Sequence, residues 1–323
     1  MTRVAGIDCG TNSIRLLVAD VDPATGGLIE LDRRMEVVRL GAGVDRTGRI
    51  APESMARTLD AARRYGQVCT ELGVQRLRFV ATSASRDAEN TDEFTAGVRA
   101  ALGVDPEVID GAEEAALSFR GATVALADTH EGPFCVVDIG GGSTEVVLGD
   151  AAPVGSASMD VGCVRLTERH LHSDPPSGAE VAAAHADVAA GLDVAARAVP
   201  MGRTRTLVGL AGSVTTVTAH SLGLHQYDPE LIHGAVLPVD RVLAACSELL
   251  GMSRVERAAL PFMHPGRFDV IGAGALVWAD VISRVQSEVH SSGGSLVSVV
   301  TSERDILDGI ALSAAERGEL PRA

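Results

Sequence analysis

Two stretches of the chain carry aspartate, glycine and hydroxyl residues in the same order. In VVDIGGGSTEVVLG, residues 136–149, a carboxylate ends an apolar run and is followed by three glycines, a hydroxyl pair and a second carboxylate. The stretch VAGIDCGTNSIRLLVAD near the N-terminus aligns with it, so that Asp8 matches Asp138, Gly10 matches Gly140 and Ser13 matches Ser143. The offset of 130 residues is about the size of a domain and too long for a solenoid repeat. The sequence therefore predicts an internally duplicated chain.

Each copy is typical of a strand, a tight turn and a second strand, because apolar runs flank a few Gly, Asn and Ser residues. Successive backbone N–H groups at such a turn can bind an anion, and an aspartate leaving the first strand can hold a cation. The alternative is that glycines such as Gly140–Gly142 only make a tight turn. Two matching loops, each preceded by an aspartate, favour phosphate binding over that alternative.

The charge balance limits what else the protein could bind. The 43 acidic residues outnumber the 28 basic ones, giving a formal net charge of −15. Such a chain has no electrostatic basis for binding nucleic acid or an anionic membrane. The sequence also contains no lysine, which excludes a Walker A lysine, a kinase lysine and a Schiff base. Any bound phosphate must therefore be held by backbone N–H groups, arginines and a metal.

The cysteines and the hydrophobic runs indicate the compartment. The five cysteines are far apart and form no CxxC motif, which indicates reduced core thiols and neither disulfides nor zinc ligands. The N-terminus lacks the charged and apolar regions of a signal peptide, and no run approaches the roughly 20 apolar residues of a membrane span. We therefore expect a cytoplasmic protein with no membrane partner.

Between the two copies, helix and strand patterns alternate. Pro52 opens a helix with apolar residues at helical spacing, and Gly73 ends it. The apolar strand RLRFVATSA then runs into Arg86, at the kind of strand end where open α/β sheets bind ligands. The next helix, AEEAALSFRGATVAL, begins with Glu113 and Glu114. Acidic residues in a first turn can serve only to balance the helix dipole, so the residue types leave the role of this pair open.

The second half repeats this alternation. Ser177 and Glu180 form a capping-box pattern before a long alanine-rich helix. TRTLVGLAGSVTTVTAH predicts a strand, a loop and a helix whose N-terminus could face a ligand, with the small or hydroxyl residues Gly209, Gly212, Ser213, Thr215 and Thr216. RFDVIGAGALVWADVI predicts a closely packed helix with Arg267 and Asp269 at its start, and LVSVVTSERDILDGIAL predicts a final strand and helix. Because no low-complexity linker separates the halves, we expect them to share an interface.

Together these motifs resemble the exopolyphosphatase and guanosine pentaphosphate phosphohydrolase family, within the superfamily of actin, sugar kinases and heat-shock chaperones. The resemblance runs nearly end to end, in the family's order, through GIDCGTNSIRLLVAD, VATSASRDAEN, VIDGAEEAALSF, VVDIGGGSTEVVLG, DVGCVRLTERHLHSDPP, GLAGSVTTV, HPGRFDVIGAGA and SERDILDGIAL. Two features depart from the family pattern. Phe268 stands where relatives often have alanine, and we expect this chain to lack the C-terminal helical domain that many relatives carry.

The resemblance implies roles for individual residues. Glu114 matches the family's proposed general base, and Arg86 matches an arginine that reaches the bound phosphates. The implied phosphate-binding residues of the two loops are Gly10, Thr11, Asn12, Ser13 and Arg15, and Gly140, Gly141, Gly142 and Ser143. The implied ligands for Mg²⁺, or alternatively Mn²⁺, are Asp8, Asp138 and Glu145.

The resemblance also implies the architecture. We expect an α/β fold of two duplicated actin-like (ribonuclease H-like) domains, each a mixed sheet flanked by helices, with the active site in the cleft between them. We expect domain I to span residues 1–123, with a C-terminal helix at 303–323 packing back onto it, and domain II to span 124–302. A homodimer is the expected assembly.

Three functions from different classes are open. The first is a phosphohydrolase acting on inorganic polyphosphate, with guanosine pentaphosphate as the competing substrate. The second is an ATP-dependent kinase of a sugar or small acid, and the third is a slow ATPase switch that works through partners. Glu114 in its VIDGAEEA context and the full set of motifs favour the first function. Because the chain lacks lysine and any long basic track, we expect short polyphosphate chains to be preferred.

Overall fold

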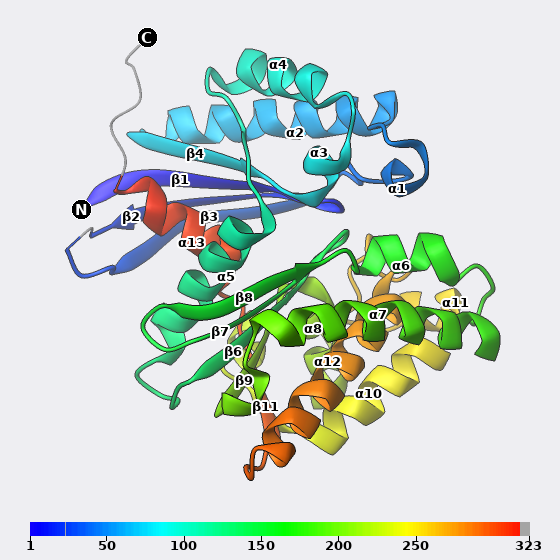
Figure 1. The fold of residues 1–323 in the computed structure, drawn as a ribbon. Helices are drawn as coiled ribbons and strands as arrows, with labels where there is room; N and C mark the ends of the chain where they lie inside the picture. The colour runs from blue at the N-terminus through cyan, green and yellow to red at the C-terminus, as the bar shows by residue number, and fades with distance from the viewer. Residues whose placement is uncertain (23, 317–323) are drawn as a thin grey trace. The chain divides into compact units, whose positions relative to one another are not determined.

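The computed structural model describes residues 1–22 and 24–316, which form two compact units (Figure 1). Unit 1 comprises Met1–Val124 and the C-terminal segment that begins at Ile306, and unit 2 comprises Ala125–Asp305. The expected domain boundaries lay at 123/124 and 302/303. Of the C-terminal helix expected over 303–323, the structure has Ile306–Ala314 as α13, and residues 317–323 lie outside the described part.

Unit 1 is built on a mixed five-stranded sheet with the order β3-β2-β1-β4-β5. β1 pairs antiparallel with β2 and parallel with β4, which in turn pairs parallel with β5. The strands are β1 Thr2–Cys9, β2 Ser13–Val21, β3 Leu28–Val37, β4 Arg76–Ala81 and β5 Glu107–Val108.

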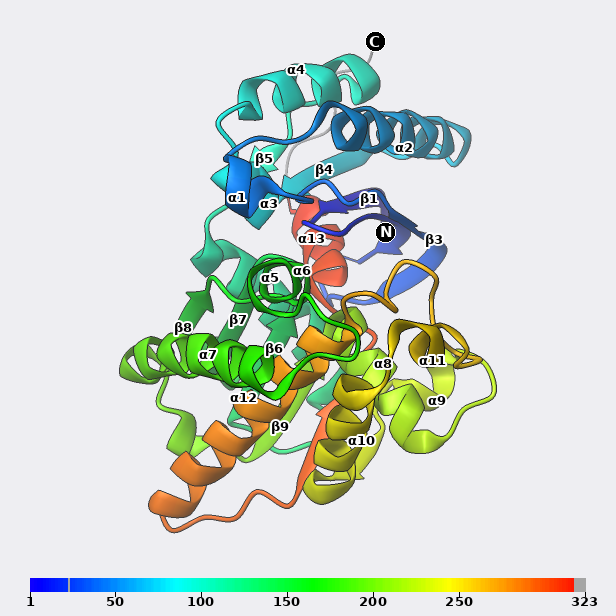
Figure 2. The ribbon, with the colours of Figure 1, turned by 90° about the vertical axis from the view of Figure 1, so that its right-hand side faces the viewer.

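Helices cover both faces of this sheet (Figure 1, Figure 2). One face carries the long helices α2 (Pro52–Glu71) and α4 (Thr91–Leu102), against which Ile7 and Leu16 pack. The other face carries α13, against which Val4 and Leu17 pack, with α5 (Gly111–Leu126) beside it. Alternate residues of β1 and β2 therefore point to opposite faces that are both covered, which explains why the middle of each strand, residues 4–7 and 16–19, is apolar on both faces.

Unit 2 has a mixed six-stranded sheet with the order β10-β11-β9-β6-β7-β8. Its strands are β6 Phe134–Ile139, β7 Thr144–Gly149, β8 Pro153–Met159, β9 Thr206–Leu210, β10 Val236–Pro238 and β11 Ser298–Thr301. Its longer helices are α6 Cys163–His170, α7 Gly178–Ala198, α8 Ala211–Leu222, α10 Val239–Gly251 and α12 Ile271–Ser291. A single large apolar cluster around Trp278 joins these helices to one face of the sheet.

The predicted duplication is confirmed at the level of strand pairing. β1, β2 and β4 pair as β6, β7 and β9 do: an antiparallel hairpin, with a parallel strand on the other side of its first strand. The tips also match, since Gly10 N donates to Ser13 O and Gly140 N donates to Ser143 O, both at 3.0 Å. The repeated unit therefore extends beyond the hairpin that the sequence revealed.

Two local expectations are confirmed, one is wrong, and one strand was missed. α7 begins with the predicted Ser177–Glu180 capping box, and the helix predicted from Pro52 ends at Glu71. The loop expected before α8 is absent, because β9 runs directly into the helix through Ala211, whose φ is +65°. β3, an edge strand in which half of the residues are charged and half are exposed, was not predicted.

Candidate active site

The segments that carry the predicted residues of unit 1 leave one edge of its sheet. β1, β4 and β5 are parallel neighbours, with Cys9 opposite Ala81 and Ala81 opposite Val108 at their C-terminal ends. The glycine loop follows β1, Arg86 follows β4 and Glu114 follows β5 shortly afterwards. The C-terminal edge of parallel strands is where open α/β sheets bind ligands, so the topology gathers three separate motifs at one edge.

The first glycine loop is a three-residue turn between β1 and β2. Besides the Gly10–Ser13 bond, Thr11 O accepts from Gly41 N at 2.8 Å and Asn12 O accepts from Arg39 N at 2.8 Å. The Thr11 hydroxyl is buried and has no hydrogen-bond partner within residues 1–22 and 24–316. A buried hydroxyl normally has a partner, so this one is suited to a ligand oxygen.

Asp8 and Arg15, expected to bind metal and phosphate respectively, form an ion pair with each other. They are opposite residues of the β1–β2 ladder, so their side chains share a face of the sheet. Asp8 Oδ2 accepts from Arg15 Nε at 2.9 Å and from Nη2 at 2.6 Å. The guanidinium therefore balances the charge of this buried aspartate.

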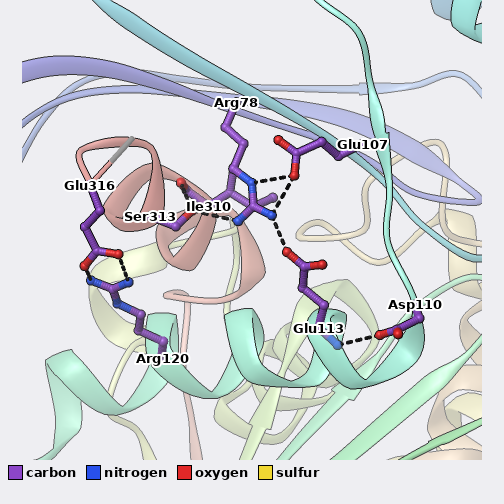
Figure 3. A network of polar contacts seen from close by, with 8 residues as sticks. All are labelled: Arg78, Glu107, Asp110, Glu113, Arg120, Ile310, Ser313 and Glu316. Carbon is purple, nitrogen blue, oxygen red and sulfur yellow. Dashed lines mark hydrogen bonds and ion pairs between the residues drawn. The ribbon is translucent and has the colours of Figure 1, made fainter. Parts of the chain in front are cut away.

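The structure distinguishes the two adjacent glutamates at the start of α5. Arg86 Nη1 lies 3.3 Å from Glu114 Oε2 and also donates to the Ile109 carbonyl at 2.8 Å. Glu114 is buried, whereas Glu113 is half exposed and pairs with Arg78 (Figure 3). Two residues of one type thus have different partners, and Glu114 is the one beside an arginine at the ligand edge of the sheet.

The second glycine loop, Gly140–Ser143, rests on the start of α6. Gly140 O accepts from Cys163 N at 3.0 Å, and Gly141 O accepts from Val164 N at 2.9 Å. A Cβ atom added to Gly162 would lie 2.5 Å from Gly141 O. Glycine is therefore needed at position 162, just before α6, for the helix to approach the loop this closely.

We expect Gly162→Ala to distort the second loop. The methyl group would meet backbone atoms of residues 141 and 142, which cannot rotate away. Overpacking of this kind costs about 1–3 kcal/mol, and the half-saturating substrate concentration should rise several-fold. Denaturant unfolding and steady-state kinetics measure the two effects.

Gly178→Ala is the matched control, because no atom lies within 4 Å of a Cβ at this first residue of α7. It should leave both measurements unchanged. Equal behaviour of the two variants would contradict the close approach at Gly162.

Asp138 and Glu145 form a carboxylate pair beside this loop. They are opposite residues of the β6–β7 ladder, so their side chains share a face, and both are buried. Glu145 Oε1 accepts from the Ser158 hydroxyl at 2.7 Å. The equivalent pair in unit 1 is Asp8 and Arg15, so the duplication holds a cation–carboxylate pair in one unit and two carboxylates in the other.

Arg267 is placed at the start of α8 by a turn in the sequence HPGR. Arg267 N donates to His264 O at 2.9 Å, with Pro265 in the second position of the turn. Gly266 N donates to the His264 Nδ1 at 3.0 Å; burial, and next the charge of Arg267, lowers the pKa of this imidazole. The guanidinium lies against Gly212, where any Cβ would overlap it.

This arrangement brings two positive groups together, since the N-terminus of α8 also carries a partial positive charge. Their mutual repulsion is offset when an anion binds to the guanidinium and to the helix N-terminus together. Arg267 was noted in the sequence only as lying at a helix start. Its position against Gly212 comes from contacts between distant segments.

Other residues of this segment, which was expected to face a ligand, instead make packing contacts and hydrogen bonds within the protein. A Cβ at Gly209 would overlap Trp278 and Val214, so this glycine permits core packing. The Thr216 hydroxyl donates to Gly212 O at 2.6 Å, and the Thr215 hydroxyl accepts from Tyr227 at 2.8 Å. All five cysteines are buried and free, as predicted, and burial raises the pKa of the Cys163 thiol.

The part of the chain that the structure describes contains neither a cluster of three metal-binding side chains nor a candidate membrane span. Within 1–22 and 24–316, no group of three or more His, Cys, Asp or Glu side chains is placed to hold a metal ion by itself. In the same residues no helix has the length and apolar character of a membrane span.

Comparison with known proteins identifies the family. The model of the Ppx/GppA phosphatase family matches residues 17–298. The chain belongs to this family. Mycobacterium tuberculosis H37Rv has a relative named exopolyphosphatase 2 that is 51% identical over 98% of this chain and 99% of its own length. The predicted family resemblance and the α/β fold of two mixed sheets are thereby confirmed.

Two further similar proteins differ in the activity for which they are named. A crystal structure described as an exopolyphosphatase-like protein superimposes with a TM-score of 0.94 at 45% identity, covering 98% of this chain and 99% of that one. A guanosine-5'-triphosphate,3'-diphosphate pyrophosphatase of Aeromonas salmonicida is 30% identical over 90% of this chain and 57% of its own length. The relatives thus include proteins named for both of the competing substrates.

Proposed function

We propose that the protein is an exopolyphosphatase that hydrolyses the terminal phosphoanhydride bond of inorganic polyphosphate and releases orthophosphate. The observation that carries this proposal is the 51% identity, over nearly the whole of both chains, to a relative named exopolyphosphatase 2. The paired Arg86 and Glu114 at the ligand edge of unit 1 support it.

In the proposed reaction, Glu114 orients a water molecule and accepts its proton while the oxygen attacks the terminal phosphorus in line. The bond to the bridging oxygen breaks, and the shortened chain leaves. Most of the catalysis is positioning and neutralisation of charge on phosphate oxygens. Arg86 and backbone N–H groups of both glycine loops supply the neutralisation, and the Thr11 hydroxyl donates to a phosphate oxygen.

The carboxylates Asp138 and Glu145 suit a hard divalent cation. Mg²⁺ is commonly held by one or two carboxylates together with substrate phosphates, and these two share a sheet face. We propose that they hold Mg²⁺, with Mn²⁺ as the alternative, and that the metal supplies charge neutralisation at phosphate oxygens. In this proposal Asp8, which is paired with Arg15, maintains the geometry of the first glycine loop and is not a metal ligand.

The runner-up function is removal of the 5′-phosphate of guanosine pentaphosphate, which the Aeromonas relative's name favours. The deciding experiment measures phosphate release from short polyphosphate, long polyphosphate and guanosine pentaphosphate with Mg²⁺ in excess. A higher kcat/KM for the guanosine nucleotide would overturn the proposal. Phosphate transfer from ATP to a sugar or small acid would instead indicate a kinase.

We expect partial digestion of long polyphosphate to give a ladder of shortened chains. Processive threading needs an extended basic track, because the polymer carries about one negative charge per phosphate. The arginines of β3 do not supply one: Arg33 donates to Glu30 and Asp308, and Arg34 donates to Asp32. Gel analysis of partly digested polymer checks this.

Free phosphate together with only full-length polymer would show processive threading. Such a result would favour the alternative that a homodimer assembles a basic groove from Arg33, Arg34 and Arg39 of both subunits. We propose a cytoplasmic homodimer in either case, and size-exclusion chromatography with light scattering tests the assembly.

A further inference from the structure

A buried arginine, Arg78 of β4, joins three elements of unit 1 (Figure 3). Its side chain is only 3% exposed. Nη2 donates to Glu107 of β5 at 2.9 Å and to the carboxylate of Glu113 in α5. Nη1 donates to the hydroxyl of Ser313 in α13 at 2.8 Å. A planar guanidinium can make all of these bonds at once, which an ammonium group cannot match in geometry.

One of these bonds, the one to Glu113, acts on the turn that carries the proposed base. Glu113 and Glu114 are consecutive in the first turn of α5. The Asp110 carboxylate accepts from Glu113 N at 2.9 Å, and the Asp110 carbonyl accepts from Glu114 N at 3.0 Å. The backbone of the turn is thus held by Asp110, and its outer side by the Arg78–Glu113 pair.

The bond from Arg86 to the Glu114 carboxylate is comparatively long. Arg86 Nη1 lies 3.3 Å from Glu114 Oε2, beyond the usual 2.7–2.9 Å of a charge-assisted bond. Because the Glu114 side chain starts from the first turn of α5, the direction of its carboxylate depends also on how firmly this turn is held. Catalysis by a general base is sensitive to displacements of about 1 Å.

We propose that Arg78 is a positioning residue: by holding Glu113, it fixes the first turn of α5 and the direction in which Glu114 presents its carboxylate. The inference rests on the function proposed above, in which Glu114 is the base. It differs from a purely stabilising role, because it predicts that Arg78 acts on turnover through Glu113.

The test compares Arg78→Met, which fills the site without charge, with Arg120→Met. Arg120 lies on α5, the helix that carries Glu113, and pairs with Glu316 at 2.6 Å, away from the first turn of that helix. We expect Arg78→Met to lower kcat about tenfold with KM within twofold, and to speed amide hydrogen exchange of residues 111–116 in the unliganded protein. Arg78→Lys should recover part of the loss, and Arg120→Met should change neither measurement.

A double-mutant cycle with Glu113→Gln tests the route. Glu113 is 46% exposed, so this isosteric change should leave the protein folded even if Arg78→Met does not fold. We expect Glu113→Gln alone to lower kcat a few-fold, and the double variant to be no slower than Arg78→Met. Additive losses in the cycle, or full turnover in Glu113→Gln, would overturn action through Glu113.

Hydrogen exchange separates this inference from the proposed function. If the wild type releases no phosphate from either substrate, the proposed function fails, while exchange still decides whether Arg78 holds the turn. Unchanged exchange of residues 111–116 in Arg78→Met would overturn the inference whatever the substrate is.

Discussion

Glu114→Gln should lower turnover by about 100-fold or more with little change in substrate binding. Glutamine keeps the size and much of the hydrogen bonding of glutamate but cannot accept the proton of the attacking water. The bond to Arg86 at 3.3 Å can persist with the amide oxygen. Single-turnover and steady-state phosphate release from short polyphosphate measure kcat and KM separately.

Glu113→Gln is the matched control for this prediction. It makes the same change of atoms at the neighbouring residue. Unlike Glu114, Glu113 pairs with Arg78 and is half exposed. The positioning role inferred above allows a loss of a few-fold, well below the effect at Glu114. Equal losses in the two variants would remove the reason for choosing Glu114 as the base.

The second large effect is expected in the metal requirement of Asp138→Asn. A hard cation prefers charged oxygen ligands to a neutral amide oxygen, so the Mg²⁺ concentration for half-maximal rate should rise by roughly tenfold or more. Titrating Mg²⁺ at saturating polyphosphate gives this value directly. Asp150→Asn, an exposed aspartate just after β7, should leave it unchanged.

Excess chelator provides the complementary measurement. The wild type should lose its activity and regain it when Mg²⁺ or Mn²⁺ is restored. Full activity in chelator would contradict the metal role altogether. Asp8→Asn should also impair turnover, but without the shifted Mg²⁺ requirement, because Arg15 already balances its charge.

The hairpins were predictable because their signal is local. An apolar run, an aspartate and a glycine turn occupy about a dozen consecutive residues, and the second copy repeats them. The β3 strand carried no such signal, since an edge strand with exposed charged residues need not alternate between apolar and polar positions. Nothing in the residue type at Ala211 indicates its positive φ, which lets β9 enter α8 without a loop.

The sequence around each site residue does not show which distant residue it contacts in the fold. Glu113 and Glu114 are adjacent residues of the same type, but they have different partners. Glu113 pairs with Arg78, 35 residues earlier in the chain, and Glu114 pairs with Arg86, 28 residues earlier. Only the fold brings these segments together. The family resemblance assigned a role to Glu114, whereas the contacts of Arg78 and the pairing of Asp8 with Arg15 required the structure.

The position of α13 has a consequence for synthesis of the protein. α13 covers one face of the first sheet, packing on β1 and β2, and Gly309 meets the Leu117 carbonyl of α5 so closely that a methyl group would overlap it. The ribosome must add the roughly 180 residues of unit 2 before this helix emerges, which takes about 10–40 s at ~5–20 residues per second. Until then Val4 and Leu17 lack their apolar cover. The first unit to be translated is therefore the last to be completed.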